Sequence, residues 1–167
     1  MLYETTMTSP IGPLRLIASD TGLRAVLWPD DDPNRIHLNE STIVDGGHPI
    51  LAASVTQLEE YFDGTRTGFD LPLDPQGTDF QQACWHALAT IPYGSTASYG
   101  EQAEMIGRPQ AVRAVGGANG RNPLSIVVPC HRVIASSGAL SGFAGGLDMK
   151  KWLLDFESAQ NSSGREI

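Results

Sequence analysis

The segment 63–77 divides the 167-residue sequence into two halves with different patterns. It is rich in Gly, Asp, Pro and Thr, which favour turns and interrupt both helices and strands. Short apolar runs separated by turn signals precede it, whereas apolar residues at helical spacing follow it. We therefore predict an N-terminal lobe at 1–77, a second lobe at 78–157 and a C-terminal tail at 158–167.

Three short strands and one helix are expected in the first lobe. The strands are predicted at 2–7, 14–19 and 23–28. The hairpin signal Asp20-Thr21-Gly22 joins the last two. A helix follows because apolar residues recur at helical spacing at Ile50, Leu51, Val55, Leu58, Tyr61 and Phe62. The stretch 29–49 is polar, carries the acidic run 30–32 and is predicted to be a surface connection.

The second lobe is predicted to be mostly helical. Capping boxes begin two helices, one formed by Thr78 and Gln81 and the other by Ser98 and Glu101. The first helix carries an apolar stripe made of Phe80, Ala83, Cys84, Ala87, Leu88 and Ile91. A short helix at 110–119 follows a tight turn, which gives a helix-turn-helix pattern. The fold class is therefore α+β, with a small N-terminal β-sheet lobe that carries a helix and a mostly helical second lobe.

Two glycines, Gly116 and Gly117, lie inside the second helix of this motif. A glycine costs roughly 1 kcal/mol relative to alanine in a helix interior. Either the helix approaches a partner closely at this point or it packs tightly within the core. The pattern alone favours neither interpretation.

The formal charge of −8 argues, taken alone, against DNA or another polyanion as a partner. The acidic residues are unevenly distributed, however. Residues 1–79 hold 13 acidic and four basic residues, whereas residues 80–157 hold five acidic and six basic ones. The second lobe is therefore near neutral, and the charge of a partner must be judged against the lobe that meets it.

Composition excludes several other classes of protein. Cys84 and Cys130 are the only cysteines and the four histidines lack ligand spacing, so we expect neither a disulfide scaffold nor a metal site. The sequence shows no secretory signal, and no apolar run approaches the roughly 20 residues that a membrane span needs. We therefore expect a cytoplasmic protein with no cofactor and no membrane contact.

A Cys-His dipeptide is the strongest chemical signal. Cys130 follows Pro129 and an apolar run at 124–128, which predicts a short buried strand. A nearby base raises the thiolate fraction of a cysteine. Neighbours on an extended segment point to opposite faces, so His131 acts on Cys130 through a water unless the chain turns there. The alternative is a structural cysteine beside a surface histidine. The carboxylate that would orient the histidine is left open among Glu101, Glu104 and Glu157.

Five stretches of the second lobe match one family in composition and order. They are FQQACW at 80–85, IPYGSTASYG at 91–100, RAVGGANGRNP at 113–123, IVVPCHRVI at 126–134 and SGALSGFAGGLDMKKWLLDFE at 137–157. Through them the sequence resembles the 6-O-alkylguanine-DNA alkyltransferases, or methylated-DNA–protein-cysteine methyltransferases. A looser match at 9–28 covers the family's N-terminal hairpin.

This resemblance implies a DNA repair reaction. Cys130 would accept a methyl or larger alkyl group from O-6 of guanine in one irreversible displacement, once per molecule. A 4-O-alkylthymine is a further substrate that the resemblance allows. His131 would draw the thiol proton through a bridging water and Glu157 would hold the histidine. Asn122 would link the helix-turn-helix to the site.

The resemblance also implies double-stranded DNA as the partner, bound through the minor groove by a monomer, with cooperative binding left open. The target base lies within a duplex and must be flipped out. Arg113 would fill the vacated place in the stack, and Tyr99 would push the flanking phosphate and donate to the departing guanine. The other predicted binding residues are Ala114, Gly116, Val133, Ser136 and Phe143.

Three positions depart from the family's pattern. Phe143 stands where tyrosine is common, Ala144 where some members have serine, and Gln102 where an aliphatic residue is usual. Three other functions are alternatives: a damage sensor of the alkyltransferase-like type, a Cys-His hydrolase and a transcriptional regulator. Cys130 argues against the sensor, because such sensors lack the acceptor cysteine. A hydrolase would leave the helix-turn-helix without a role. A regulator is expected to carry an additional domain, which this sequence does not show.

Overall fold

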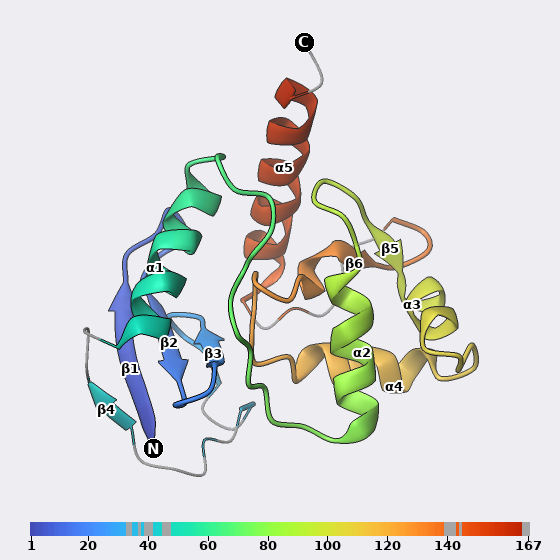
Figure 1. Ribbon diagram of the computed structural model, residues 1–167. Helices are drawn as coiled ribbons and strands as arrows, with labels where there is room; N and C mark the ends of the chain where they lie inside the picture. The colour runs from blue at the N-terminus through green and yellow to red at the C-terminus, as the bar shows by residue number, and fades with distance from the viewer. Residues whose placement is uncertain are drawn as a thin grey trace. The chain divides into compact units, whose positions relative to one another are not determined.

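A computed structural model describes residues 1–32, 35, 36, 38, 42–44, 48–138, 143 and 145–164, with only the backbone of 42–44 and 161–164. The chain forms two compact units (Figure 1). The first comprises Met1–Gln76 and Pro123–Val127, and the second comprises Gly77–Asn122 and the chain from Val128 onward. The sequence pattern did not indicate that the short segment Pro123–Val127 packs with the first unit.

The first unit is built on a four-stranded sheet in the order β3-β2-β1-β4. Its strands are β1 (Leu2–Met7), β2 (Leu14–Ala18), β3 (Leu23–Leu27) and β4 (Thr42–Val44). The first three pair antiparallel and confirm the predicted strands, whereas β4 pairs parallel to β1 within a stretch predicted to be a connection. Helix α1 (Pro49–Phe62) packs against the sheet (Figure 1). It begins at Pro49 because the Nδ1 atom of His48 accepts a hydrogen bond from the Ile50 N–H.

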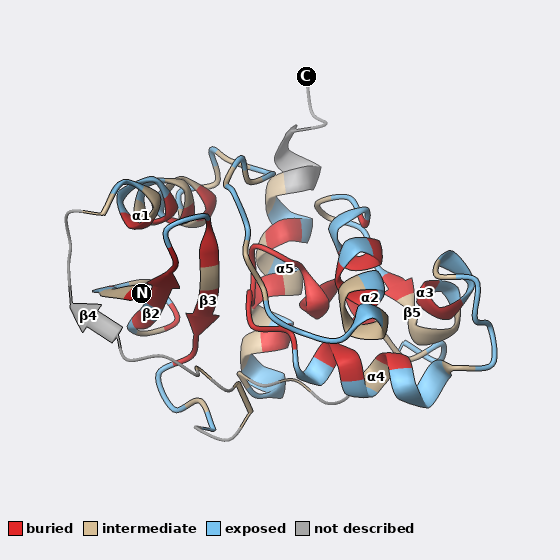
Figure 2. Ribbon diagram, turned by 60° about the horizontal axis from the view of Figure 1, so that its bottom comes forward, coloured by how far each residue is buried: buried red, intermediate tan, exposed pale blue. Residues whose placement is uncertain are grey.

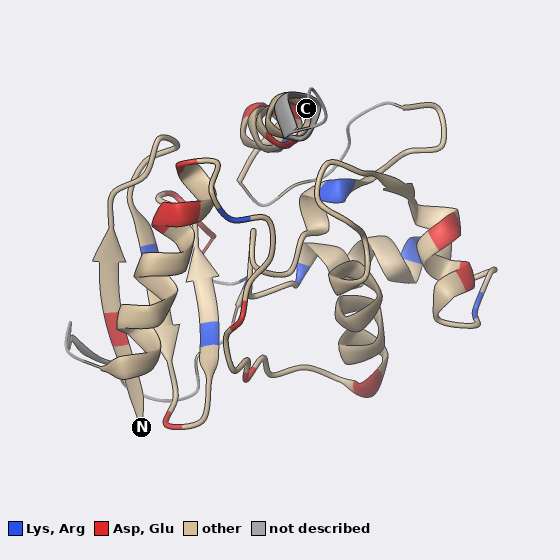
Figure 3. Cartoon of the chain, turned by 45° about the horizontal axis from the view of Figure 1, so that its top comes forward, with Lys and Arg blue, Asp and Glu red and all other residues tan. Residues whose placement is uncertain are grey.

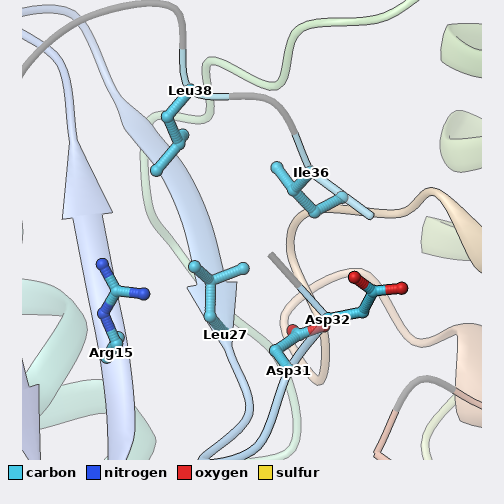
Figure 4. Close-up of a pocket in the computed structure, with 6 residues that line it drawn as sticks. All are labelled: Arg15, Leu27, Asp31, Asp32, Ile36 and Leu38. Atoms are coloured by element: carbon cyan, nitrogen blue, oxygen red, sulfur yellow. The ribbon is translucent and has the colours of Figure 1, made fainter. Parts of the chain in front are cut away.

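The acidic excess of the sequence lies in this first unit, on β1, α1 and the connecting loops (Figure 3). A pocket of about 280 Å³ also belongs to it (Figure 4). The pocket is lined by Arg15, Leu27, Asp31, Asp32, Ile36 and Leu38. None of these is a predicted site residue.

The segment 124–128 is buried, as predicted, but it is not a strand. It forms a series of turns with a single bridge between Leu124 and Val26. The Val26 N–H donates to the Pro123 carbonyl at 2.8 Å, and the Trp28 indole N–H donates to the Ser125 hydroxyl at 3.0 Å. Ile126 adopts a φ of 73°, an unusual value for a β-branched residue. The pattern predicted a strand here because an apolar run that is buried on all sides shows no periodicity that distinguishes a strand from a buried turn.

The second unit is mostly helical, with one two-stranded ladder. Its elements are α2 (Asp79–Ala89), β5 (Ala97–Ser98), α3 (Tyr99–Met105), α4 (Val112–Gly120), the 3-10 helix η1 (Cys130–Arg132), β6 (Val133–Ile134) and α5 (Leu147–Gly164). Both predicted capping boxes are formed, by Thr78 with Gln81 and by Ser98 with Glu101. The helix α5 continues past Glu157 into the stretch 158–167 that was expected to be a tail. Within the described residues, none of the helices has the length and apolar character needed to cross a membrane.

Candidate active site and DNA-binding surface

Cys130, His131 and Arg132 form the single turn η1, so the chain turns at the Cys-His dipeptide. The turn follows from Pro129, where the Arg132 N–H donates to the Pro129 carbonyl at 3.0 Å. All three side chains are buried, and His131 is 0% exposed. The alternative of a surface histidine is therefore wrong. The two cysteines of the chain, both described, are not joined by a disulfide.

Glu157 of α5 is the carboxylate that holds the histidine. Its Oε2 lies 2.7 Å from Nε2 of His131, and the Glu157 side chain is 1% exposed. The two other carboxylates left open by the sequence are exposed. Glu101 caps α3, and Glu104 lies on its outer face.

Arg132 is the second partner of Glu157. Its Nε donates to Oε1 at 2.8 Å and its Nη2 donates to Oε2 at 3.0 Å. The remaining Nη1 donates to the Ile91 carbonyl at 2.7 Å. Paired N–H donors of this kind fix the plane of a carboxylate, so Arg132 sets the direction in which Glu157 faces the histidine.

These contacts decide the charges of the cluster. Burial alone would raise the pKa of Glu157, but hydrogen bonds from His131 and Arg132 lower it to about 2. Burial lowers the pKa of His131, and the hydrogen bond to Glu157 only partly opposes this effect. The histidine is therefore neutral and Nε2 carries its proton, because a carboxylate can only accept. Its Nδ1 is buried, forms no hydrogen bond with any described residue and is the nitrogen that can take up a proton.

A parallel ladder joins the start of the helix-turn-helix to the segment after η1. In it, Ala97 pairs with Val133 and Ser98 pairs with Ile134. Tyr99 follows Ser98 directly as the first residue of α3, so it lies beyond the Ser98–Ile134 end of the ladder, whereas Val133 pairs with Ala97 at the other end. The Nζ of Lys150 lies 5.9 Å from the centre of the Tyr99 ring, and Lys150 is 1% exposed.

Asn122 connects the end of α4 to the segment that carries Cys130. It is buried, and its Nδ2 donates to the Val128 carbonyl at 2.8 Å, two residues before Cys130. Ser136 lies exposed in a turn and Phe143 is half-buried, whereas Ala144 lies outside the described residues. The structure thus places Asn122 against the segment that carries the thiol.

Part of the helix α4 is exposed (Figure 2). Small residues and the cation Arg113 occupy this exposed face. Arg113, Ala114 and Gly117 are exposed there, and a Cβ added to Gly117 would meet nothing within 4 Å. Gly116 differs, because a Cβ added to it would lie 3.9 Å from the Tyr99 ring. Gly117 thus favours approach of an outside partner, whereas Gly116 faces a side chain of its own unit.

Comparison with known proteins agrees with this geometry. Residues 2–75 match the family model "6-O-methylguanine DNA methyltransferase, ribonuclease-like domain", and residues 79–159 match "6-O-methylguanine DNA methyltransferase, DNA binding domain". The chain belongs to the 6-O-methylguanine DNA methyltransferase family. This membership confirms the family predicted from the five matching stretches.

Several relatives of this methyltransferase family are similar over nearly the full chain. The methylated-DNA–protein-cysteine methyltransferase of Mycobacterium tuberculosis is 49% identical over 163 residues, which cover 96% of this chain and 94% of the relative. The protein of the same name from Methanosarcina acetivorans is 44% identical over 158 residues, 95% of this chain and 99% of the relative. The crystal structure of Mycobacterium tuberculosis OGT in complex with DNA superposes with a TM-score of 0.87 at 46% identity, covering 95% of this chain and 94% of that one.

The sequence did not indicate two residues of this family member's site region, Arg132 and Lys150, and it marked Gln102 only as a departure from the family's pattern. Arg132 and Lys150 are buried beside the predicted residues, and Gln102 is fully buried between helices. The only signal for Arg132 was its place next to His131, because its partners Glu157 and Ile91 are distant in sequence. A charged side chain in a run of apolar residues is a usable signal, since burial of a cation requires a partner.

Proposed function

We propose that this chain repairs DNA by transferring an alkyl group from O-6 of guanine to the Sγ atom of its own Cys130. The observation that carries the proposal is the buried His131–Glu157 pair, whose histidine lies in the same turn as Cys130, within the unit that holds the helix-turn-helix. Family membership supports the same reaction, because the relatives are named methylated-DNA–protein-cysteine methyltransferases.

The chemistry is one displacement. The thiol proton passes to Nδ1 of His131 through a bridging water, and the resulting thiolate forms a bond to the alkyl carbon. The carbon–oxygen bond breaks, its electron pair stays on the guanine, and a proton from Tyr99 neutralises the departing base. Glu157 stabilises the imidazolium that forms, and Arg132 keeps Glu157 ionised. The thioether is stable, so each molecule acts once.

The second unit would also bind the substrate. We propose that α4 enters the minor groove of double-stranded DNA, with Ala114 and Gly117 close to the DNA backbone and Arg113 in place of the flipped base. Gly116 would contribute to the same surface by leaving room for the Tyr99 ring beside α4. Val133, Ser136 and Phe143 would line the place of the extruded guanine. Asn122 would couple α4 to the acceptor segment. The protein would work as a cytoplasmic monomer, with the domain 78–157 carrying both DNA binding and the acceptor thiol.

A mass measurement on the two cysteines tests this function. After incubation with duplex DNA that contains 6-O-methylguanine, peptide mass spectrometry should find one added methyl group on Cys130 and none on Cys84. Cys84 is a matched internal control, because it is also buried and burial raises the pKa of its thiol. Lesion binding with an unmodified Cys130 would instead indicate a damage sensor. Repeated turnover of an ester that is lost in Cys130→Ser would indicate a hydrolase.

A further inference from the structure

A buried pair of amide side chains joins the two helices of the helix-turn-helix. Gln102 of α3 is 0% exposed and Asn119 of α4 is 8% exposed. The Gln102 Nε2 donates to Asn119 Oδ1 at 2.9 Å, and the Asn119 Nδ2 donates back to Gln102 Oε1 at 2.7 Å. The same Nε2 also donates to the Cys84 carbonyl of α2 at 3.1 Å, so one side chain links three helices.

A second bond to α2 holds the adjacent residue of α4. The indole N–H of Trp85 donates to the Ala118 carbonyl at 2.9 Å. Two consecutive residues near the C-terminal end of α4 are therefore fixed by buried side-chain hydrogen bonds. Such bonds are directional, so they restrict both the rotation of the helix about its axis and its position along that axis.

Among the described residues, no side chain forms a comparable hydrogen bond to the opposite end of α4. Its N-cap residue, Ala111, makes no side-chain capping bond, and Val112, Arg113 and Ala114 are exposed. Arg113 precedes Asn119 by six residues, which is about 9 Å along a helix axis. A small tilt of the helix at its anchored end therefore displaces Arg113 more than the residues nearer to Asn119.

We propose that Gln102 and Asn119 are positioning residues that hold α4, and with it Arg113, in the orientation that engages the DNA duplex. This inference rests on the proposed function. An aliphatic residue at 102 would fill similar volume, but apolar contacts are non-directional and tolerate several orientations. The reciprocal amide pair allows one arrangement, because any other leaves buried donors without acceptors.

The test compares two substrates that share one chemical step. Gln102→Leu should slow repair of 6-O-methylguanine in duplex DNA about tenfold, since misplaced groups far from the chemistry have effects of that order. Reaction with a free 6-O-alkylguanine base, which needs no α4, should change less than about twofold by the same reasoning. Arg113→Ala supplies the benchmark, and Gln102→Leu should show the same selective loss on duplex DNA.

A control of matched instability separates positioning from general weakening. Ser54 of α1 is fully buried in the first unit and its hydroxyl donates to the Ile50 carbonyl at 2.7 Å. Ser54→Ala should lower the thermal midpoint and leave the ratio of the two rates unchanged. Equal losses on both substrates in Gln102→Leu, or no loss on either, would overturn the proposal. Failure of the wild-type chain to methylate Cys130 would instead overturn the proposed function.

The pH dependence of the ratio of the two rates distinguishes a positioning role of Gln102 from a purely structural one, because a purely structural role would leave this ratio unchanged. Gln102→Glu places an acceptor-only carboxylate opposite the Asn119 Oδ1 and the Cys84 carbonyl, so duplex repair should fall relative to the free-base reaction at neutral pH. Protonation restores one donor, and the ratio of the two rates should recover as the pH is lowered. Titration of His131 acts on both reactions and cancels in the ratio. A flat ratio would contradict the proposal, and this variant carries the test if Gln102→Leu is too unstable to purify.

Discussion

Two buried polar clusters of the second unit do different work. The cluster of His131, Arg132 and Glu157 holds an ionised carboxylate between two potential cations, whereas the cluster of Gln102 and Asn119 is neutral. The charged cluster includes two residues of the turn that carries Cys130. The neutral cluster joins α3 to α4, the helix with the exposed face of small residues. Both clusters are held by short hydrogen bonds, but in the charged cluster Nδ1 of His131 is left without a partner among the described residues. The difference indicates that ionised side chains surround the histidine, which must take up a proton. Neutral amide hydrogen bonds join the helices, where only the orientation of α4 matters.

Removing the charge of the first cluster should give the largest effect. Glu157→Gln leaves the guanidinium of Arg132 buried without a compensating charge, a change that typically costs about 3–5 kcal/mol of unfolding free energy. Alkyl transfer to a free base should also slow strongly, because the imidazolium loses its counter-charge. Urea unfolding and single-turnover kinetics measure both effects. Asp155→Asn is the matched control two residues earlier on α5, because its partner Lys151 is 67% exposed, and it should change neither quantity appreciably.

The second largest effect should be a difference between the two clusters in how their contribution to stability depends on pH. The pKa of Glu157 is lowered from 4.5 to about 2, so between these values the unfolded chain binds more protons than the folded chain. The stability from this carboxylate, on the order of 3 kcal/mol, is therefore fully present above pH 4.5 and is lost as the pH falls toward 2. The pKa of His131 is also lowered, from 6.5, so its contribution declines in the same direction below pH 6.5.

Unfolding curves at a series of pH values check this difference between the clusters. The wild-type chain and Gln102→Leu should lose stability in parallel on acidification, because the neutral cluster has no group that titrates. Glu157→Gln should lose much less between pH 4.5 and 2. Parallel loss in all three proteins would show that the charged cluster does not set the acid response.

Local signals explain which parts of the molecule the sequence predicts. The capping boxes at Thr78 and Ser98 involve residues three positions apart, so the pattern contains both partners. The strands β1, β2 and β3 follow from short apolar runs bounded by turn signals, which are local for the same reason. In the site, the Cys-His dipeptide is equally local. It indicated the turn that carries Cys130, although the strand predicted before it at 124–128 is wrong.

Interactions between distant residues explain what the sequence did not predict. Arg132 and Glu157 are 25 positions apart, and Gln102 and Asn119 are 17 apart, so no spacing rule joins them. The choice of Glu157 over Glu101 and Glu104 came from family resemblance rather than from the pattern of charges. The unusual Gln102 was noticed as a departure, but its meaning depends on Asn119, which only the packing of α3 against α4 reveals.

The smallest effect on stability should come from replacing the whole neutral cluster. A single Gln102→Leu leaves the Asn119 amide buried without its partner and should cost about 1–3 kcal/mol, whereas the double variant Gln102→Leu with Asn119→Leu removes both partners and should come within about 1 kcal/mol of the wild-type chain. Duplex repair should remain slow in the double variant, because leucine pairs restore packing without restoring one orientation of α4. Chemical denaturation and the two-substrate assay measure these quantities on the same preparations. If the double variant regains full duplex repair along with its stability, the pair serves packing alone, and the contrast between a cluster for charge and a cluster for orientation fails.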